Sequence, residues 1–272
     1  MLLLVDLDGV VYRGREPVPG VAQVLQRRAA AGDDVIYVTN NSRSHRDEYR
    51  ARLAAMGLPL ANEQSIVTAA RATAVVLSEE QPRAQAAMVL GGPGLARELR
   101  DVGLRALAPT ENGLAGRPDV LVVGVDFSLT YERLSIAAEA VRRGARFVAT
   151  NRDPVYPVPD RLNAGAGAMV AAVAVAAARQ PDLVVGKPEP RLFMAAAASS
   201  GWPAREAVII GDNLLTDIRA ARAVGARSIL MMTGVTTAAE LEAAAEDERP
   251  TAVARDATQL EECLRRLDSE AR

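Results

Sequence analysis

Four short stretches of this sequence place chemically active side chains directly after a predicted strand. They are Asp6-Leu7-Asp8-Gly9, Thr39-Asn40-Asn41-Ser42, Gly186-Lys187 and Gly211-Asp212-Asn213. Each follows a run of aliphatic residues that is typical of a strand buried on both faces. Because a buried charge is costly unless something compensates it, we expect the acids of these stretches to share a partner.

The acids alone predict a metal site. Asp6, Asp8 and Asp212 at neighbouring strand ends would repel one another, and at least one would take up a proton, unless a cation lay among them. Mg²⁺ prefers oxygen ligands and is commonly held by one or two carboxylates together with phosphate oxygens and water. The spacing therefore indicates a magnesium site that also admits a phosphate group.

The remaining polar residues suit a phosphoryl group. Lys187 is the only lysine of the chain, and it would bring positive charge to the same edge of the sheet. Thr39 and Asn40 would add hydrogen-bond donors there. A carboxylate next to a bound phosphoryl group can attack phosphorus, as in aspartyl-phosphate chemistry. Together these residues predict phosphoryl transfer.

Strands that alternate with helices must position these residues. This pattern predicts an α/β protein with a Rossmann-like, doubly wound parallel sheet, in which ligands bind beyond the carboxyl ends of the strands. The strands predicted for this core are 2–5, 34–38, 183–185, 207–210 and 228–231. Residue 187 would then follow a core strand, as residues 6, 39 and 212 do.

The middle of the chain reads as a second α/β module inserted into the first. Its predicted elements are strands 87–90, 120–125 and 145–149 and the helix 131–143. We therefore predict a catalytic core of residues 1–78 and 182–272, with an inserted α/β cap domain of residues 79–181. The glycines at 91–94 are interpreted as a turn, and those at 165–167 as a connection back toward the core.

The ordered motifs resemble a known family. D-L-D-G-V, T-N-N-S, G-K-P and G-D-N-x-x-T-D are similar to the motifs of the haloacid dehalogenase superfamily of phosphatases. V-G-V-D, T-N-R-D and G-A-G in the insert resemble its class IIA branch, which includes NagD-like, p-nitrophenyl, phosphoglycolate and glycerol-phosphate phosphatases. The resemblance implies a Mg²⁺-dependent phosphomonoester hydrolase that acts on small phosphorylated metabolites such as phosphoglycolate, glycerol phosphate, nucleotides, sugar phosphates or p-nitrophenyl phosphate.

The resemblance also implies roles for the core residues. Asp6 is the nucleophile that becomes a phosphoaspartate, and Asp8 is the general acid and base. Magnesium is held by the side chains of Asp6 and Asp212 and by the backbone carbonyl of Asp8. Lys187 bridges the phosphate and the nucleophile. Asp217 lies behind this layer, orienting Lys187 or a metal-bound water.

Further residues are expected around the substrate. The candidates for binding the phosphate or the rest of the substrate are Thr39, Asn40, Asn41, Asn151 and Arg152, and Asn213 is expected beside Asp217. Arg152 would attract an acidic leaving group. His45 is the only histidine, and we interpret it as an exposed residue at a helix start rather than as a catalytic base.

Other functions fit these residues less well. A phosphomutase or phosphotransferase would pass the phosphoryl group to a sugar, but the large insert does not resemble the small helical cap of the mutases. A receiver module also uses acids, a threonine and a lysine, but this chain is too long for one. A non-catalytic metabolite-binding protein remains a further alternative, although every expected chemical residue is present.

Composition sets the broad class. The 272 residues are 49% hydrophobic and 24% charged, with a net charge of −2, which is typical of a globular protein and favours neither a nucleic acid nor a membrane as partner. Cys263 is the only cysteine and fits a reducing compartment. With no signal peptide recognised, we expect a cytoplasmic protein, and the frequency of twofold dimers favours a homodimer.

Overall fold

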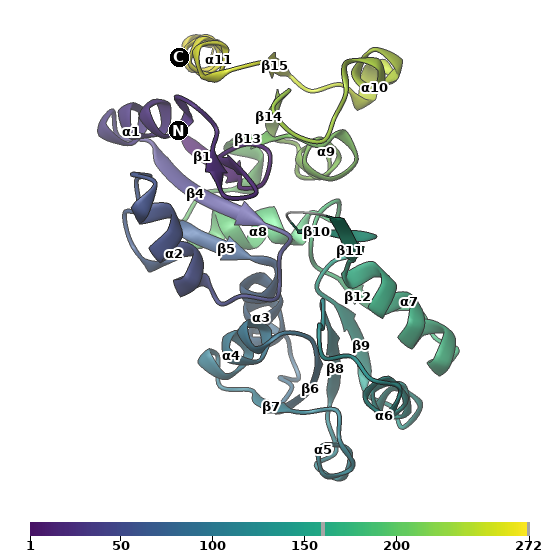
Figure 1. The fold of residues 1–272 in the computed structure, drawn as a ribbon. Coiled ribbons are helices and arrows are strands. Elements are labelled where there is room, and N and C mark those ends of the chain that lie inside the picture. Colours follow the sequence, from purple (N-terminus) through teal and green to yellow (C-terminus); the bar gives the residue numbers. More distant parts are fainter. Residues whose placement is uncertain (159–160, 271–272) are drawn as a thin grey trace. The chain divides into compact units, whose positions relative to one another are not determined.

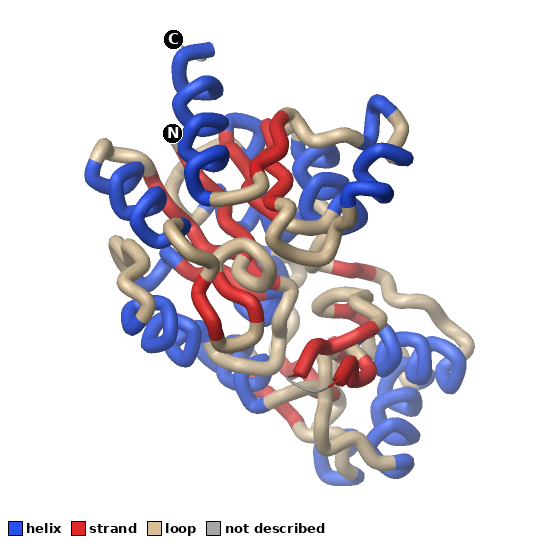
Figure 2. Tube along the Cα trace, turned by 45° about the horizontal axis from the view of Figure 1, so that its top comes forward, coloured by secondary structure: helices blue, strands red, loops and turns tan. Residues whose placement is uncertain are grey.

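The computed structural model describes residues 1–158 and 161–270 and forms two compact units. Unit 1 comprises Met1–Thr39, Tyr49–Val67 and Lys187–Arg272, and unit 2 comprises Asn40–Glu48 and Thr68–Gly186. Each unit is built on its own parallel sheet, with helices beside the strands (Figure 2). The predicted α/β class is confirmed. The division of labour between a catalytic core and a cap of residues 79–181 stays a prediction.

Unit 1 is organised around a six-stranded sheet with β1 near its centre. The strand order is β15-β14-β13-β1-β4-β5 (Figure 1). The strands are β1 (Leu2–Asp6), β4 (Asp34–Thr39), β5 (Ile66–Thr68), β13 (Ala207–Gly211), β14 (Arg227–Met231) and β15 (Ala252–Ala254). The chain runs from β1 to one side through β4 and later returns on the other side through β13. Strand order therefore reverses at β1, where a doubly wound sheet binds its ligand.

Helices cover both faces of this sheet. The helices of this part of the chain are α1 (Val21–Ala30), α2 (Arg46–Ala55), α8 (Arg191–Ala198), α9 (Arg219–Val224), α10 (Ala238–Ala243) and α11 (Ala257–Glu270); of these, α10 buries no residue. Leu3 and Val5 pack in one core cluster with Val24 and Leu25 of α1 and Leu264 of α11. Helix α8 instead contacts β1, β4 and α9. Because alternate side chains of β1 enter two apolar layers, the whole strand is buried and its end is held in place.

Short elements complete unit 1. A two-stranded ribbon follows β1 and consists of β2 (Tyr12–Arg13) and β3 (Glu16–Pro17). Three 3₁₀ turns lie at η1 (Glu63–Ser65), η2 (Ala204–Glu206) and η4 (Glu246–Glu248), and a π-helical turn, η3 (Leu214–Ile218), precedes α9. This π-helical turn contains Asp217, and such turns are frequent at functional sites.

Unit 2 contains a five-stranded parallel sheet with the order β12-β9-β8-β6-β7. Its strands are β6 (Ala86–Leu90), β7 (Arg105–Leu107), β8 (Val120–Val123), β9 (Arg146–Ala149) and β12 (Leu183–Val184). Its helices are α3 (Ala69–Glu79), α4 (Pro93–Asp101), α5 (Glu111–Ala115), α6 (Tyr131–Arg142) and α7 (Ala166–Ala177). A hairpin of β10 (Val155–Val158) and β11 (Arg161–Ala164) precedes α7.

One predicted core strand lies in the other sheet. Residues 183–185 were expected to return the chain to the core, but β12 pairs with β9, with Leu183 opposite Val148 and Val184 opposite Ala149. The local sequence is apolar enough for either sheet, and pairing decides between them. Lys187 therefore follows a strand of unit 2 and is the first residue of the returning unit 1 segment.

Two glycine-rich stretches begin helices, contrary to prediction. Gly92 caps α4, which starts at Pro93, so residues 91–94 are not simply a turn. Proline suits the first helical position because the N–H it lacks would have no partner there. Gly165 likewise caps α7, and Gly167 lies inside that helix. The stretch 165–167 thus opens a helix of unit 2 rather than leading back to the core.

Candidate active site

The ends of three adjacent core strands bring predicted site residues together. Asp6 is the last residue of β1 and pairs with Val38 of β4, which directly precedes Thr39. On the other side, Val5 pairs with Ile210 of β13, two residues before Asp212. Asp6, Thr39 and Asp212 are all buried. The parallel register therefore places these three side chains at one edge of the sheet, as the sequence predicted.

Lys187 forms the centre of the cluster. Its Nζ donates to Asp6 Oδ1 at 2.5 Å and to Asp217 Oδ1 at 2.7 Å. Only 3% of Lys187, 6% of Asp6 and 1% of Asp217 is exposed, so this double ion pair is shielded from water. Such shielding makes each partner depend on the others, because a buried charge left alone is strongly unfavourable.

Local backbone structure makes room for Asp217. It lies in the π-helical turn η3, five residues after Asp212. A Cβ on Gly211 would come within 2.2 Å of the Asp217 Cβ and 2.3 Å of its Cγ. Glycine at position 211 therefore allows Asp217 to pack against the end of β13. The Asp217 Oδ2 also accepts hydrogen bonds from the Asn213 backbone N–H and the Thr216 hydroxyl, both at 3.3 Å.

Three buried carboxylates could hold a cation. Oxygen atoms of Asp6, Asp212 and Asp217 lie within 4.8 Å of one another. The Oδ2 of Asp212 also accepts the backbone N–H of Val235 at 2.7 Å. An all-oxygen donor set of this kind suits a hard divalent ion. The geometry makes all three carboxylates candidate ligands.

The electrostatics point to a missing positive charge. Burial raises the pKa of Asp6 well above its usual value, an effect that Lys187 opposes and that Asp217 and Asp212 reinforce. Burial, with the nearby Asp217 carboxylate, raises the pKa of Asp212 to about 7. Burial alone would lower the pKa of Lys187, but Asp217 and Asp6 together raise it. The single positive charge of Lys187 therefore does not balance three carboxylates, whereas Lys187 together with a divalent cation would.

Asp8 differs from the other acids of the site. Its side chain is exposed, whereas that of Asp6 is buried. The protein atoms around it still remove enough water to raise the pKa of its carboxyl, although Arg52, Lys187 and a hydrogen bond with Tyr12 partly oppose this. Arg52 itself stacks over the Tyr12 ring, with Cζ 3.6 Å from the ring centroid. A carboxyl that is both accessible and raised in pKa can hold a proton and release it.

The other predicted binding residues belong to unit 2. Asn40 Nδ2 donates to both carboxylate oxygens of Asp153, at 3.0 and 3.1 Å. Asn151 Nδ2 donates to the Asn40 carbonyl at 2.7 Å, and its Oδ1 accepts the Asp153 N–H at 3.0 Å. Asn41 donates to the Tyr156 hydroxyl at 3.0 Å. The Asn151 side chain is therefore hydrogen-bonded to backbone atoms, while the Arg152 side chain is exposed.

His45 is buried, so the prediction of an exposed helix-start residue is wrong. Only 2% of it is exposed, and its Nε2 lies 3.0 Å from Asp101 Oδ2 and 3.4 Å from Glu98 Oε1. Glu98 is fully buried and also pairs with Arg46. Local sequence gave no signal for this, because the partners lie in α4, more than fifty residues away. His45 belongs to a structural ion-pair network of unit 2.

Sequence reasoning missed residues that surround the predicted ones. Asn213 was expected beside Asp217, and its backbone N–H donates to Asp217 Oδ2 at 3.3 Å. The part that was missed is that its side chain caps η3 by accepting the Leu215 N–H at 2.8 Å, which its position before a helix could have signalled. The loop Met232–Thr236 contacts Asp212, and the sequence analysis assigned it no role. Asp153, which holds Asn40, was noted only as part of T-N-R-D. Such partners are polar residues in loops and carry no periodic pattern.

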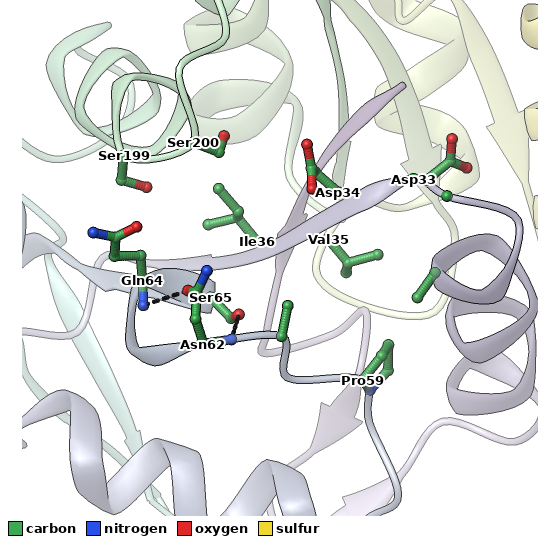
Figure 3. Close-up of a pocket in the computed structure, with 13 residues that line it drawn as sticks. Asp33, Asp34, Val35, Ile36, Pro59, Asn62, Gln64, Ser65, Ser199 and Ser200 are labelled. Atoms are coloured by element: carbon green, nitrogen blue, oxygen red, sulfur yellow. Dashed lines mark hydrogen bonds between the residues drawn. The ribbon is translucent and has the colours of Figure 1, made fainter.

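A pocket of about 270 Å³ lies elsewhere in unit 1. It opens at the amino end of β4, around Asp34 and Ile36 (Figure 3), and Asp34 pairs with Leu2 at the edge of the sheet opposite Asp6. Its polar groups are used within the protein: Asp34 accepts the Trp202 indole N–H at 2.7 Å, and Asn62 caps η1. It contains none of the predicted site residues.

Comparisons with known proteins agree with this fold. Two family models match, one described as haloacid dehalogenase-like hydrolase over residues 3–105 and one as HAD-like hydrolase over residues 184–260. The acid sugar phosphatase of Staphylococcus saprophyticus is 38% identical over 239 residues, which are 88% of this chain and 89% of that protein. These matches place the chain in the class of haloacid dehalogenase-like hydrolases.

Solved structures identify the branch of the family to which the chain belongs. The p-nitrophenyl phosphatase from Archaeoglobus fulgidus is 31% identical with a TM-score of 0.87, covering 96% of this chain and 98% of that one. The glycerol phosphate phosphatase from Mycobacterium tuberculosis, solved in complex with magnesium, is 36% identical with a TM-score of 0.85, covering 95% of this chain and 75% of that one. The chain belongs to the haloacid dehalogenase-like hydrolases, in the NagD-like and p-nitrophenyl phosphatase branch.

Proposed function

We propose that this protein is a Mg²⁺-dependent phosphatase that hydrolyses monoesters of small phosphorylated metabolites. The observation that carries the proposal is the buried cluster in which Lys187 Nζ joins Asp6 and Asp217 beside Asp212. This cluster combines a carboxylate nucleophile, a fixed cation and a second acid that can share a metal. The relatives' names, acid sugar phosphatase, glycerol phosphate phosphatase and p-nitrophenyl phosphatase, support the same chemistry.

Asp6 performs the first step. An oxygen of its carboxylate forms a bond to phosphorus while the bond from phosphorus to the ester oxygen breaks, which leaves a phosphoaspartate. Lys187 reduces the repulsion between the carboxylate and the incoming phosphate, and Asp217 holds the ammonium in place at 2.7 Å. Fixed charge of this kind acts where charge develops and needs no rearrangement during the reaction.

Asp8 moves the protons. In the first step its carboxyl donates a proton to the leaving ester oxygen. In the second it takes a proton from the water that attacks phosphorus, which releases phosphate and restores Asp6. Its raised pKa and its accessible side chain suit both tasks. Such general acid–base assistance is commonly worth about 10²–10⁴-fold in rate.

Magnesium would be held by Asp6 and Asp212, with the backbone carbonyl of Asp8 as a further ligand. The fit rests on the close carboxylate oxygens and on the raised pKa values of Asp6 and Asp212. When bound, the ion would neutralise charge on the phosphoryl oxygens. The chain itself then supplies the nucleophile Asp6, the proton-transfer group Asp8 and a second positive charge on Lys187.

The remaining residues are proposed to bind substrate. Thr39, Asn40 and Asn41 are assigned to the phosphate, and Asn151 and Arg152 to the loop that faces the leaving group. We propose that the inserted module acts as a cap, which would select the leaving group and exclude water. Asn151 would act indirectly, because its amide donates a hydrogen bond to the Asn40 carbonyl. Arg152 would act directly, because its charged side chain is exposed.

Location and assembly complete the proposal. A single cysteine favours a cytoplasmic protein, and the frequency of twofold dimers favours a homodimer. Among the described residues, no helix combines the length and apolar character needed to cross a membrane. Gel filtration with light scattering would decide between monomer and dimer.

The test is phosphate release from a panel of monoesters, with Mg²⁺ and with a chelator. The panel contains glycerol phosphates, phosphoglycolate, pyridoxal phosphate, sugar phosphates, nucleoside monophosphates and p-nitrophenyl phosphate. We expect release that requires Mg²⁺ and one strongly preferred metabolite. D6N is the matched control, because it keeps the size of the side chain and removes the nucleophile. Folded protein that released phosphate from none of them would refute the proposal, and release by D6N at the unsubstituted rate would refute the assignment of Asp6.

A further inference from the structure

The loop Met232–Thr236 follows β14 and holds Asp212 from two sides. Val235 donates its backbone N–H to Asp212 Oδ2 at 2.7 Å, and Thr236 donates its N–H to the Asp212 carbonyl at 3.1 Å. The Thr236 hydroxyl in turn accepts the Leu214 N–H at 3.1 Å. The loop thus fixes both the side chain and the backbone of Asp212, as well as the turn that follows it.

The same loop is tied to the segment after Asp6. The Thr233 hydroxyl donates to the Gly9 carbonyl at 2.6 Å, and Arg13 donates to the Thr233 carbonyl. Gly9 directly follows Asp8 in the chain. The first and last acidic motifs, more than two hundred residues apart, are therefore joined through five residues of one loop.

Gly234 is the point of closest approach. A Cβ at this position would lie 1.9 Å from Asp212 Oδ2 and 2.5 Å from both its Cβ and its Cγ. Rotating the Asp212 side chain cannot relieve the contact with Cβ, because that atom is bonded to the backbone. Gly9 lies close to the same atom: an added Cβ there would lie 2.3 Å from Asp212 Oδ2 and 2.9 Å from the Gly234 Cα. Two neighbouring glycines therefore pack against one carboxylate.

Backbone conformation does not explain glycine at position 234. Gly9 has φ +81°, in the left-handed region that favours glycine. Gly234 is not among the described residues with positive φ, so alanine could adopt its backbone conformation without strain. The obstacle to a side chain at position 234 is the space taken by Asp212.

We propose that Gly234 is a positioning residue, which with Thr233 and Val235 sets the place of the Asp212 carboxylate for the metal. The inference rests on the proposed function in one respect, that Asp212 is a metal ligand. Mg²⁺ tolerates little departure from octahedral geometry, so a displaced carboxylate weakens binding. Substitutions of residues that orient metal ligands typically cost about 10–100-fold in affinity.

The first experiment measures Mg²⁺ affinity by calorimetry, without substrate. We expect G234A to raise the Kd about 10–100-fold. The control is V175A, since 83% of Val175 is exposed on α7, and its Kd should equal that of the unsubstituted protein. T233V should also raise the Kd, whereas T233S, which keeps the hydroxyl, should not. A Kd for G234A equal to that of V175A would overturn the proposal.

The second experiment needs no metal. Thermal unfolding in chelator is compared for the unsubstituted protein, G234A, D212G and D212G/G234A. We expect G234A to lower Tm by at least about 2–4 °C when Asp212 is present, and by little in the D212G background, because glycine at position 212 removes the Cβ, Cγ and Oδ2 atoms that the new methyl group would meet. Equal losses in both backgrounds would overturn the proposal.

The design separates this inference from the proposed function. If G234A fails to fold, D212G/G234A must fold, and failure of both would overturn the positioning role. If the unsubstituted protein binds no Mg²⁺, the proposed function is refuted, while the unfolding comparison in chelator still decides whether Gly234 and Asp212 are coupled.

Discussion

Lys187→Met removes the cation from the buried cluster while keeping an unbranched apolar side chain. The ammonium donates to Asp6 at 2.5 Å and to Asp217 at 2.7 Å, and all three groups are at least nine-tenths buried. Removing one partner of a buried ion pair typically costs about 3–5 kcal/mol. We expect K187M to lose about this much free energy of unfolding at pH 8 in chelator, out of the roughly 5–15 kcal/mol usual for a domain.

The loss should depend on pH. Without the lysine, the cluster can reduce its surplus negative charge by taking up protons, because the pKa values of Asp6 and Asp212 are raised. A carboxyl whose pKa is higher in the folded state stabilises the fold at low pH, and this contribution is lost as the pH rises through that pKa. The destabilisation by K187M should therefore be smaller at pH 5 than at pH 8.

The assay is denaturant unfolding followed by circular dichroism at both pH values. Arg205→Met is the control, because Arg205 pairs with Glu206 at 3.3 Å on the surface with 71% of its side chain exposed, and such pairs contribute about 0–1 kcal/mol. Activity of K187M should fall at least about 10²–10³-fold. A K187M protein as stable as the R205M control at pH 8 would refute the reasoning that Lys187 compensates buried charge.

Three further predictions follow from the same site. D8N should slow release of the leaving group and of phosphate, so kcat falls about 10²–10⁴-fold; normal steady-state turnover would refute the proton-transfer role of Asp8. The apparent Mg²⁺ affinity should fall about tenfold per pH unit below pH 7, because the ion must displace a proton from Asp212, whose pKa is about 7; calorimetric Kd values that stay constant from pH 5.5 to 8 would contradict this. R152A should lower kcat/KM for acidic metabolites such as phosphoglycolate more than for p-nitrophenyl phosphate; an unchanged ratio across the panel would remove Arg152 from substrate binding.

The sequence predicted which core residues the structure brings together, because these residues follow strands. Asp6 and Asp212 end runs of aliphatic residues, and parallel pairing of such strands places their ends side by side. Lys187 was identified from its position after an apolar run, although that run belongs to β12 in the other sheet. The choice between two sheets depends on long-range pairing, which a short apolar run does not encode.

The contacts that sequence reasoning missed all depend on distant partners. His45 has the local sequence of an exposed helix start, yet it is buried against Glu98 and Asp101 of α4. The contact of the Asn151 amide with the Asn40 carbonyl was not foreseen, while substrate binding by Asn151 stays a prediction. The sequence analysis assigned Gly234 no role. In each case the deciding neighbour comes from another segment of its own unit, so no local pattern could reveal it.

Trapping the phosphorylated residue tests the central claim most directly. The D8N protein is incubated with Mg²⁺ and p-nitrophenyl phosphate, quenched in acid, reduced with borohydride and digested after arginine. Digestion yields the peptide 1–13, which contains Asp6 and the substituted position 8. We predict that fragmentation of this peptide places the modification on Asp6, and that the D6N/D8N double variant shows none. A modification on another residue, or steady turnover by D6N, would contradict Asp6 as the nucleophile.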